Sequence, residues 1–274
     1  MKQDLYISGM LDRTLRYFSK EDVEMVRNTV FAISGLGGVG AITAELLARW
    51  GVKRFRLLDM DVYDESNLNR QLFSTSRTIG RNKVNVTEER IREINPFATV
   101  EMKIADRVDN QNVHQFVENA DFLVQNADHP SCKLFYLAAR KHKVPLVNGY
   151  ATITGGRVQS FDYRISSCTS FLEKIWNKYK FKDTKPLESM SRNELVEFDN
   201  QNVHSTAPSL NFVTNMVGCM IVSEAIKLIT GKGNSVQYPN YYYFDLFKNK
   251  SGIRNEVSPL NPDNIAKLAS FFWR

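Results

Sequence analysis

The sequence has few cysteines and no apolar leader. Its 274 residues contain three cysteines, an odd number that cannot pair completely, and the opening MKQDLYISGM carries no apolar signal core. These features exclude a small secreted domain held together by disulfides. We therefore expect a protein of the reducing cytoplasm.

The sequence also has no long uninterrupted hydrophobic run. The most apolar stretch, residues 210–229, is interrupted by five polar side chains. They are Asn211, Asn215, Ser223, Glu224 and Lys227. This pattern predicts a buried helix of a globular protein and no membrane segment.

Internal repeats and low-complexity tracts are absent as well, which argues against solenoids and long linkers. The composition, with 43% hydrophobic and 24% charged residues, is that of a globular chain, and the length is near the upper limit for a single hydrophobic core. The formal net charge of +6 is spread along the sequence. It leaves nucleic acid, nucleotide and acidic peptide open as partners.

Strand-like and helix-like segments alternate along the first half of the chain, which predicts βαβ units and parallel strands. The expected strands are residues 29–34, 54–58, 99–104, 122–125 and 144–148, and the expected helices are 41–50 and 82–94. A hairpin pattern at 152–164 and a strand at 241–246 predict antiparallel pairing further on. The predicted fold class is α/β, a Rossmann-like doubly wound mixed sheet with a parallel N-terminal half and a partly antiparallel C-terminal half.

Four segments follow from this pattern. They are an N-terminal helical segment (1–28), a nucleotide-binding half (29–165), a crossover segment (166–207), and a C-terminal helix with strands completing the same domain (208–274). Residues 178–202 are highly charged and weakly periodic, so we expect a mobile crossover over the edge of the sheet.

The motif GLGGVG, with Gly35, Gly37, Gly38 and Gly40, follows a predicted strand and opens a helix. Glycines at this place let backbone N–H groups approach phosphates at the positive end of a helix. Asp59 ends the next strand about 20 residues later, the spacing at which a carboxylate binds ribose hydroxyls. The motif predicts a nucleotide site, although a plain tight turn would also account for the glycines.

Polar side chains follow Asp59 in one connection and at the start of one helix. They are Asp61, Asn67, Arg70, Gln71 and Lys83. Alone, Arg70 or Lys83 would be a solvated surface cation, but beside a glycine-rich loop the two charges suit a triphosphate.

Asp128 lies just past a predicted parallel strand, at the edge where open α/β sheets bind ligands. It is a candidate magnesium ligand, and the cap of a helix before Pro130 is the alternative role. The four histidines form no spaced metal or triad pattern. Only His129 falls near the predicted site.

Together, GLGGVG, Asp59-Met60-Asp61, SNLNRQ, the lysine of IGRNK and the later APSLNFVTNMVG resemble the ThiF/MoeB superfamily, relatives of ubiquitin-activating enzymes. The resemblance covers about residues 16–246. It implies ATP-dependent adenylation of the C-terminal carboxylate of a small protein or peptide, with release of pyrophosphate, by a homodimer. ADHP followed by VPLVNGY is similar to the microcin-type branch that adenylates a peptide.

The resemblance also implies residue roles. Asp59 would bind ribose, Arg70 and Lys83 would bind phosphates and act in catalysis, and Asp128 would hold Mg²⁺. The glycines Gly35, Gly37, Gly38 and Gly40, with Asp61, Asn67 and Gln71, would complete the nucleotide site.

The cysteines depart from the family pattern. Many relatives hold a zinc ion with two CxxC pairs, whereas here Cys168 stands alone, so we predict no structural zinc. Residues 178–207 contain no cysteine that could form a thioester, which argues against transthiolation. Cys168 is more simply a small, partly buried side chain than a nucleophile, and Cys132 and Cys219 are predicted to be core residues.

The N-terminal arginine motif is incomplete too. RYFSK keeps Arg16 and Tyr17 of a family pattern whose second arginine enters the neighbouring subunit's site, but Ser19 occupies that position. Lys20 or Arg13 is a substitute, and a charged helix start is the alternative.

Other functions stay open. Adenylation of a carboxylate carried by tRNA, as in the tRNA-dehydratase branch, would use the basic charge. A non-catalytic carrier-binding or pseudo-enzyme subunit has no need for Asp59, Arg70, Lys83 and Asp128 together, and an NAD-dependent oxidoreductase leaves the last three without a shared role. The identity of the substrate is left undetermined.

Overall fold

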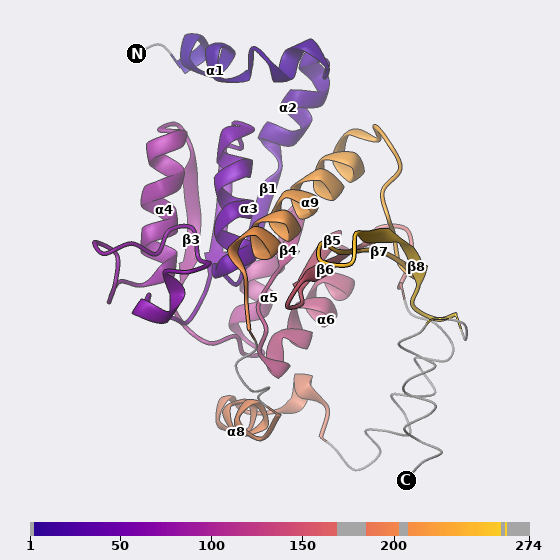
Figure 1. The fold of residues 1–274 in the computed structure, drawn as a ribbon. Helices are drawn as coiled ribbons and strands as arrows, with labels where there is room; N and C mark the ends of the chain where they lie inside the picture. Colours follow the sequence, from indigo (N-terminus) through magenta and orange to yellow (C-terminus); the bar gives the residue numbers. More distant parts are fainter. Residues whose placement is uncertain (1–2, 169–184, 203–207, 259–260, 262–274) are drawn as a thin grey trace.

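The computed structural model describes residues 3–168, 185–202, 208–258 and 261, which form an eight-stranded sheet with helices on both faces (Figure 1). The strand order is β3-β2-β1-β4-β5-β6-β7-β8. The strands are β1 (Val30–Ser34), β2 (Arg54–Leu58), β3 (Thr99–Ile104), β4 (Phe122–Gln125), β5 (Leu146–Ala151), β6 (Gly155–Phe161), β7 (Asn240–Asp245) and β8 (Lys250–Asn255). The helices are α1 (Gln3–Leu11), α2 (Lys20–Asn28), α3 (Gly38–Arg49), α4 (Lys83–Ile94), α5 (Asn112–Val117), α6 (Lys133–His142), α8 (Arg192–Asn202) and α9 (Asn211–Thr230).

The first five strands are parallel and the last three are antiparallel. β1 pairs in parallel with β2 and β4, and the outer pairs β2–β3 and β4–β5 are parallel too. From β5 onward each strand pairs antiparallel with the next. The predicted mixed Rossmann-like sheet is therefore confirmed, and the carboxyl ends of five strands lie at one edge.

Two apolar cores cover the two faces of the sheet. On one face, α3, α4 and α9 pack on side chains such as Phe31, Phe55 and Val124. On the other face, α5, α6 and α8 pack on side chains such as Leu123 and Leu146. Strand β1 is buried along its whole length because it contributes to both cores.

Helix α9 belongs to the core. Its length and composition would allow it to cross a membrane, but half of its most apolar 18-residue stretch is buried inside the protein. A Cβ on Gly218 would lie 2.2 Å from Ile42 Cγ2 of α3, and one on Gly149 of β5 would lie 2.4 Å from Ile221 Cδ1. The prediction of a buried helix is confirmed by this close packing against α3 and the sheet.

Two element boundaries differ from the sequence prediction for clear reasons. Strand β5 begins at Leu146 rather than residue 144, because Pro145 has no N–H for the ladder. Helix α3 begins at Gly38 rather than residue 41, so the last glycines of the motif form its first turn.

Strand β8 was not predicted, because its sequence KSGIRN has an exposed polar face.

Within the predicted crossover segment, residues 192–202 form helix α8, which was not predicted; residues 169–184 and 203–207 lie outside the described residues. Ser191 and Glu194 start the helix with a reciprocal cap. The Ser191 N–H donates to Glu194 Oε2 (2.6 Å), and the Glu194 N–H lies 3.4 Å from Ser191 Oγ. The S-x-x-E signature was present in the sequence.

Helices α1 and α2 lie at the end of the molecule opposite α8 (Figure 1). Ser19 caps α2 with a capping box and Lys20 is the first residue of that helix, as a charged helix start requires; a contact of Lys20 with a neighbouring subunit stays a prediction. Arg16 pairs with Asp12 (2.9 Å), and Tyr17 is 79% exposed. Within one chain, these N-terminal side chains are remote from the glycine motif at the carboxyl ends of the strands.

Candidate nucleotide site

The glycine motif forms a tight turn between β1 and α3. Gly35 has a positive φ of 76°, and a Cβ on it would lie 2.5 Å from the backbone nitrogen of Ala127. A Cβ on Gly40 would lie 1.8 Å from Gly35 O. Side chains at these two positions are excluded, so the backbone of the turn stays accessible at the start of α3.

The other two glycines face neighbouring segments. Gly37 is the N-cap of α3 and provides no side-chain cap, so the first N–H groups of the helix have no capping partner from that residue. A Cβ on Gly37 would touch the side chain of Gln71 (3.5 Å), and one on Gly38 would touch Thr214 of α9 (3.1 Å). The predicted glycines and Gln71 therefore lie together.

Asp59 holds the glycine turn from β2. Its Oδ2 accepts from the Leu36 N–H (2.6 Å), and its Oδ1 accepts from the Asp61 N–H (2.9 Å). Burial raises the pKa of the Asp59 carboxyl, and the charge of Lys83 opposes that shift. Each carboxylate oxygen keeps a second lone pair that ribose hydroxyls can use.

Lys83 is the first residue of α4 and is only 4% exposed. Its ammonium nitrogen lies 2.8 Å from Asp61 Oδ2 and 5.9 Å from the centre of the Tyr63 ring. The backbone N–H of Lys83 also donates to Asp61 O (3.1 Å). Asp61 thus forms an ion pair with Lys83, whose buried positive charge lies at the edge of the site.

Asn67 is the last residue of η2 (Glu65–Asn67), and Arg70 lies in the turn that follows it. The Asn67 side chain donates to Asp64 Oδ1 (3.2 Å) and is part of the cap of η2. The Arg70 guanidinium donates to Ser66 O (2.7 Å) and Asn69 Oδ1 (2.9 Å). Among the described residues, no carboxylate lies within ion-pair distance of Arg70, so its charge is available to an anion.

Asp128 lies on the loop that follows β4 and is exposed. No hydrogen bond or ion pair of its carboxylate occurs within the described residues. The N-cap of η3 (Pro130–Cys132) is His129, so the alternative reading of Asp128 as a helix cap is wrong. Because Gly35 packs against Ala127, the preceding residue, the Asp128 turn adjoins the glycine turn.

Asn126, the first residue after β4, was not predicted to belong to the site. Its side-chain oxygen and nitrogen are both buried without a hydrogen-bond partner, and a Cβ on Gly40 would lie 3.6 Å from its nitrogen. Gln71 Oε1 is buried and unpaired as well. Unpaired buried polar atoms are costly, so their presence beside the glycine turn fits a site that binds a polar ligand. The polar residue directly after a parallel strand was the available signal.

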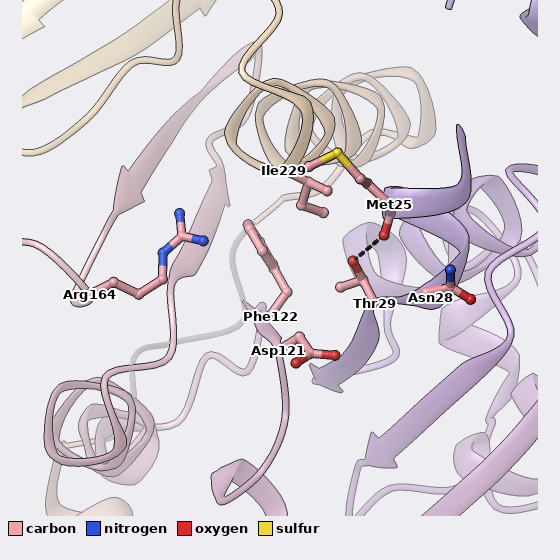
Figure 2. Close-up of a pocket in the computed structure, with 7 residues that line it drawn as sticks. All are labelled: Met25, Asn28, Thr29, Asp121, Phe122, Arg164 and Ile229. Atoms are coloured by element: carbon pink, nitrogen blue, oxygen red, sulfur yellow. Dashed lines mark hydrogen bonds between the residues drawn. The ribbon is translucent and has the colours of Figure 1, made fainter. Parts of the chain in front are cut away.

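A hollow of about 290 Å³ lies at the other edge of the sheet (Figure 2). Its lining includes Asp121 and Phe122 at the amino end of β4, together with Thr29 and Arg164. The Thr29 hydroxyl donates to Met25 O (2.8 Å), the bond drawn in Figure 2. This hollow contains none of the predicted site residues.

The three cysteines differ in their surroundings. Burial raises the pKa of Cys132 to about 12 and raises that of Cys168. Cys219 is exposed, so its assignment to the core is wrong.

Two histidines, His114 and His142, lie 3.0 Å apart between ring nitrogens, a pair that the sequence spacing did not reveal. Among the described residues, no group of three or more His, Cys, Asp or Glu side chains is arranged to hold a metal ion. The absence of zinc stays a prediction.

The model of the ThiF family matches residues 11–264. The tRNA threonylcarbamoyladenosine dehydratase of Bacillus subtilis (strain 168) is 34% identical over 131 residues, 47% of this chain and 51% of that protein. The molybdopterin-synthase adenylyltransferase of Haemophilus influenzae is 27% identical over 208 residues, 75% of this chain and 76% of that protein. The chain spans about half the length of several curated relatives that it matches.

Solved structures share the fold at low identity. A crystal structure of E. coli MccB with AMPCPP and MccA has a TM-score of 0.71 and 19% identity, covering 92% of this chain and 73% of that one. The structure of PaaA has a TM-score of 0.68 and 17% identity, covering 92% and 72%. The resemblance to a microcin-type adenylating enzyme, expected from the sequence, is thus confirmed at the level of fold.

Proposed function

The chain belongs to the ThiF family, and from that premise we propose that it is an ATP-dependent adenylyltransferase. The observation that carries the proposal is the meeting of three features at one sheet edge. They are the open glycine turn held by Asp59, the buried Lys83 paired with Asp61, and the Asp128 turn packed against Gly35.

In the proposed reaction, an oxygen of the substrate carboxylate forms a bond to the α-phosphorus of ATP. The bond from that phosphorus to the oxygen bridging to the β-phosphate breaks, and pyrophosphate leaves with the electron pair. The carboxylate is already an anion at neutral pH, so no side chain has to remove a proton. The site therefore only has to position the reactants and neutralise the phosphate charge.

The residues present suit this chemistry. Asp59 would bind the ribose, and the charges of Lys83 and Arg70 suit the phosphates. The Asp128 carboxylate, exposed and without a partner in the described part of the chain, is a hard oxygen ligand of the kind Mg²⁺ takes alongside phosphate oxygens and water. When bound, the ion would neutralise phosphate charge.

The proposed substrate is the C-terminal carboxylate of a small protein or peptide. Support comes from the names of related proteins: a molybdopterin-synthase adenylyltransferase, a SAMP-activating enzyme E1, and MccB crystallised with MccA. The second candidate is a carboxylate carried by tRNA, favoured by the similarity to tRNA threonylcarbamoyladenosine dehydratases. We further propose a cytoplasmic homodimer, which light scattering after gel filtration would test.

The nucleotide class is tested by thermal unfolding. Mg²⁺ with ATP should raise the melting temperature, because a ligand at 100 times its dissociation constant stabilises the native state by about 2.7 kcal/mol. NAD at the same concentration should not. Stabilisation by NAD and not by ATP would contradict the proposal.

The substrate class is tested by mass spectrometry. Wild-type enzyme, ATP and Mg²⁺ are incubated with a carrier protein ending in Gly-Gly, a heptapeptide with a free C-terminus, the same heptapeptide amidated, and unfractionated tRNA. An AMP adduct on the free-carboxylate chains, and not on the amidated peptide, is the expected result. An adduct on tRNA alone would select the second candidate.

A further inference from the structure

Helix α8 is attached to the loop that carries Asp128 through one buried carboxylate. The side chain of Asp199 is 1% exposed. Its Oδ1 accepts from the Ser131 N–H (2.7 Å), its Oδ2 accepts from the Ser131 hydroxyl (2.8 Å), and it forms an ion pair with Arg107. Ser131 lies three residues after Asp128, and Arg107 follows β3.

The segment before Asp199 is anchored to the connection between β3 and α5. The Asn110 side chain donates to the carbonyls of Leu187 (2.9 Å) and Met190 (2.8 Å). Arg192 pairs with Asp106 and lies 3.6 Å from Asp109. With Leu195 buried in the core under α5 and α6, α8 therefore bridges the loops that follow β3 and β4.

The Asp128 loop has a fixed point on each side of that residue. On the strand side, the Asn126 N–H donates to Ser34 O of β1 (2.8 Å). On the helix side, Pro130 has no N–H to donate, and the fixed point is Ser131, which is fully buried against Asp199. The placement of Asp128 therefore depends on the docking of α8.

We infer that Asp199 is a positioning residue for Asp128 and that docking of α8 is coupled to binding of the magnesium nucleotide. This inference rests on the proposed function, in which Asp128 holds Mg²⁺. Asp199 itself contacts Ser131 and Arg107 and does not need to touch the nucleotide. Because coupling between two sites is reciprocal, bound Mg²⁺ and ATP must also stabilise the docked α8.

The first arm of the test measures amide hydrogen exchange of residues 192–202 in the wild-type chain. Mg²⁺ with ATP should slow exchange in α8, and ATP in EDTA should slow it less. In Asp128→Asn the effect of Mg²⁺ on α8 should be lost. Equal exchange in α8 with and without Mg²⁺, in a protein that binds Mg²⁺ and ATP, would overturn the inference.

The second arm compares variants by calorimetric titration with ATP. Ser131→Ala removes one hydrogen bond to Asp199 but keeps the Arg107 pair, and Asp199→Asn keeps an acceptor but removes the charge. Both should weaken ATP binding by roughly 5-fold or more with Mg²⁺ present. Both should leave ATP binding in EDTA close to wild type, whereas a merely structural defect would weaken both.

Gln201→Ala is the matched control, since Gln201 is exposed on α8 and bonds only to Glu197 of the same helix among the described residues. It should change neither measurement. If Ser131→Ala and Asp199→Asn bind ATP with Mg²⁺ as wild type does, this inference is overturned but the proposed function is not. A wild-type chain that binds no ATP would overturn the proposed function itself. The exchange measurement on wild-type protein needs no variant to fold.

Discussion

At the scale of single residues, the two cations of the proposed site are held in different ways. Lys83 is buried and paired with Asp61, so its position is fixed before any ligand arrives. Arg70 is held by the neutral oxygens of Ser66 and Asn69 and keeps its net charge for an anion. The fixed cation suits orientation of the phosphates, and the uncompensated one suits the departing pyrophosphate.

Arg70→Ala should reduce substrate-dependent adenylation about 100-fold, because the departing pyrophosphate loses a cation worth roughly 3 kcal/mol. The melting temperature without nucleotide should change little, since the lost bonds join neighbouring residues of one surface turn. The rate of AMP-adduct formation checks the prediction, with Arg77→Ala on the nearby exposed loop as control. A loss below fivefold would argue against a role for Arg70.

Cys168→Ser should leave adenylation within a few-fold of wild type, and no enzyme–substrate thioester should form. The carboxylate is its own nucleophile, and burial raises the pKa of the Cys168 thiol, which disfavours the thiolate that would attack. Electrophoresis without reductant checks for an adduct that reductant removes. If wild type forms such an adduct and the serine variant does not, Cys168 is a transfer nucleophile.

The position of the candidate site residues at one sheet edge was easier to predict from the sequence than their contacts. Gly35, Asp59 and Lys83 follow local spacing rules, and each lies at the predicted sheet edge. The pairing of Lys83 with Asp61 and the unpaired amide of Asn126 depend on how β2, β4 and α4 approach one another. No local pattern carries that information.

At the scale of elements, the turn between β1 and α3 leaves the least space for added side-chain atoms. Gly40→Ala would place a methyl group 1.8 Å from Gly35 O, so the turn must open. We expect loss of ATP-induced stabilisation and a destabilisation of several kcal/mol, as for other severe overpacking. Thermal unfolding with and without ATP measures both effects.

Gly9→Ala is the matched control, because nothing lies within 4 Å of a Cβ at Gly9 in the last turn of α1. Alanine is a better helix former by about 1 kcal/mol, so this variant should be as stable as wild type or more so, with ATP binding unchanged. If Gly40→Ala also behaves in this way, the turn is not the tight element described above.

Helix α8 illustrates what the sequence left undetermined. Its charged, weakly periodic sequence suggested a mobile crossover because little of it is buried: Leu195 and Asp199 are the buried residues of the helix. The capping signature at Ser191 and Glu194 was local and readable. The contacts of Asp199 could not be predicted from a local pattern, because Ser131 and Arg107 lie 68 and 92 positions away from it in the sequence.

At the scale of the whole molecule, the sheet separates two ends. The N-terminal helices lie at the amino ends of the parallel strands, whereas the glycine turn, the Lys83–Asp61 pair, Asp128 and α8 lie at the carboxyl ends. Because parallel strands bring their carboxyl ends to one edge, these residues lie near one another although their sequence positions range from 35 to 199. This topology was predictable from the alternation of strands and helices.

The most direct test of the account is exchange of labelled pyrophosphate into ATP, measured for wild type and Asp128→Asn with a carboxylate substrate present. Wild type should exchange the label only when Mg²⁺ and a free-carboxylate substrate are both added. Asp128→Asn should keep the wild-type melting temperature, since this exposed side chain has no partner within the described residues, and should show no exchange above background. Full exchange in Asp128→Asn, or exchange in wild type that does not require Mg²⁺, would contradict the account.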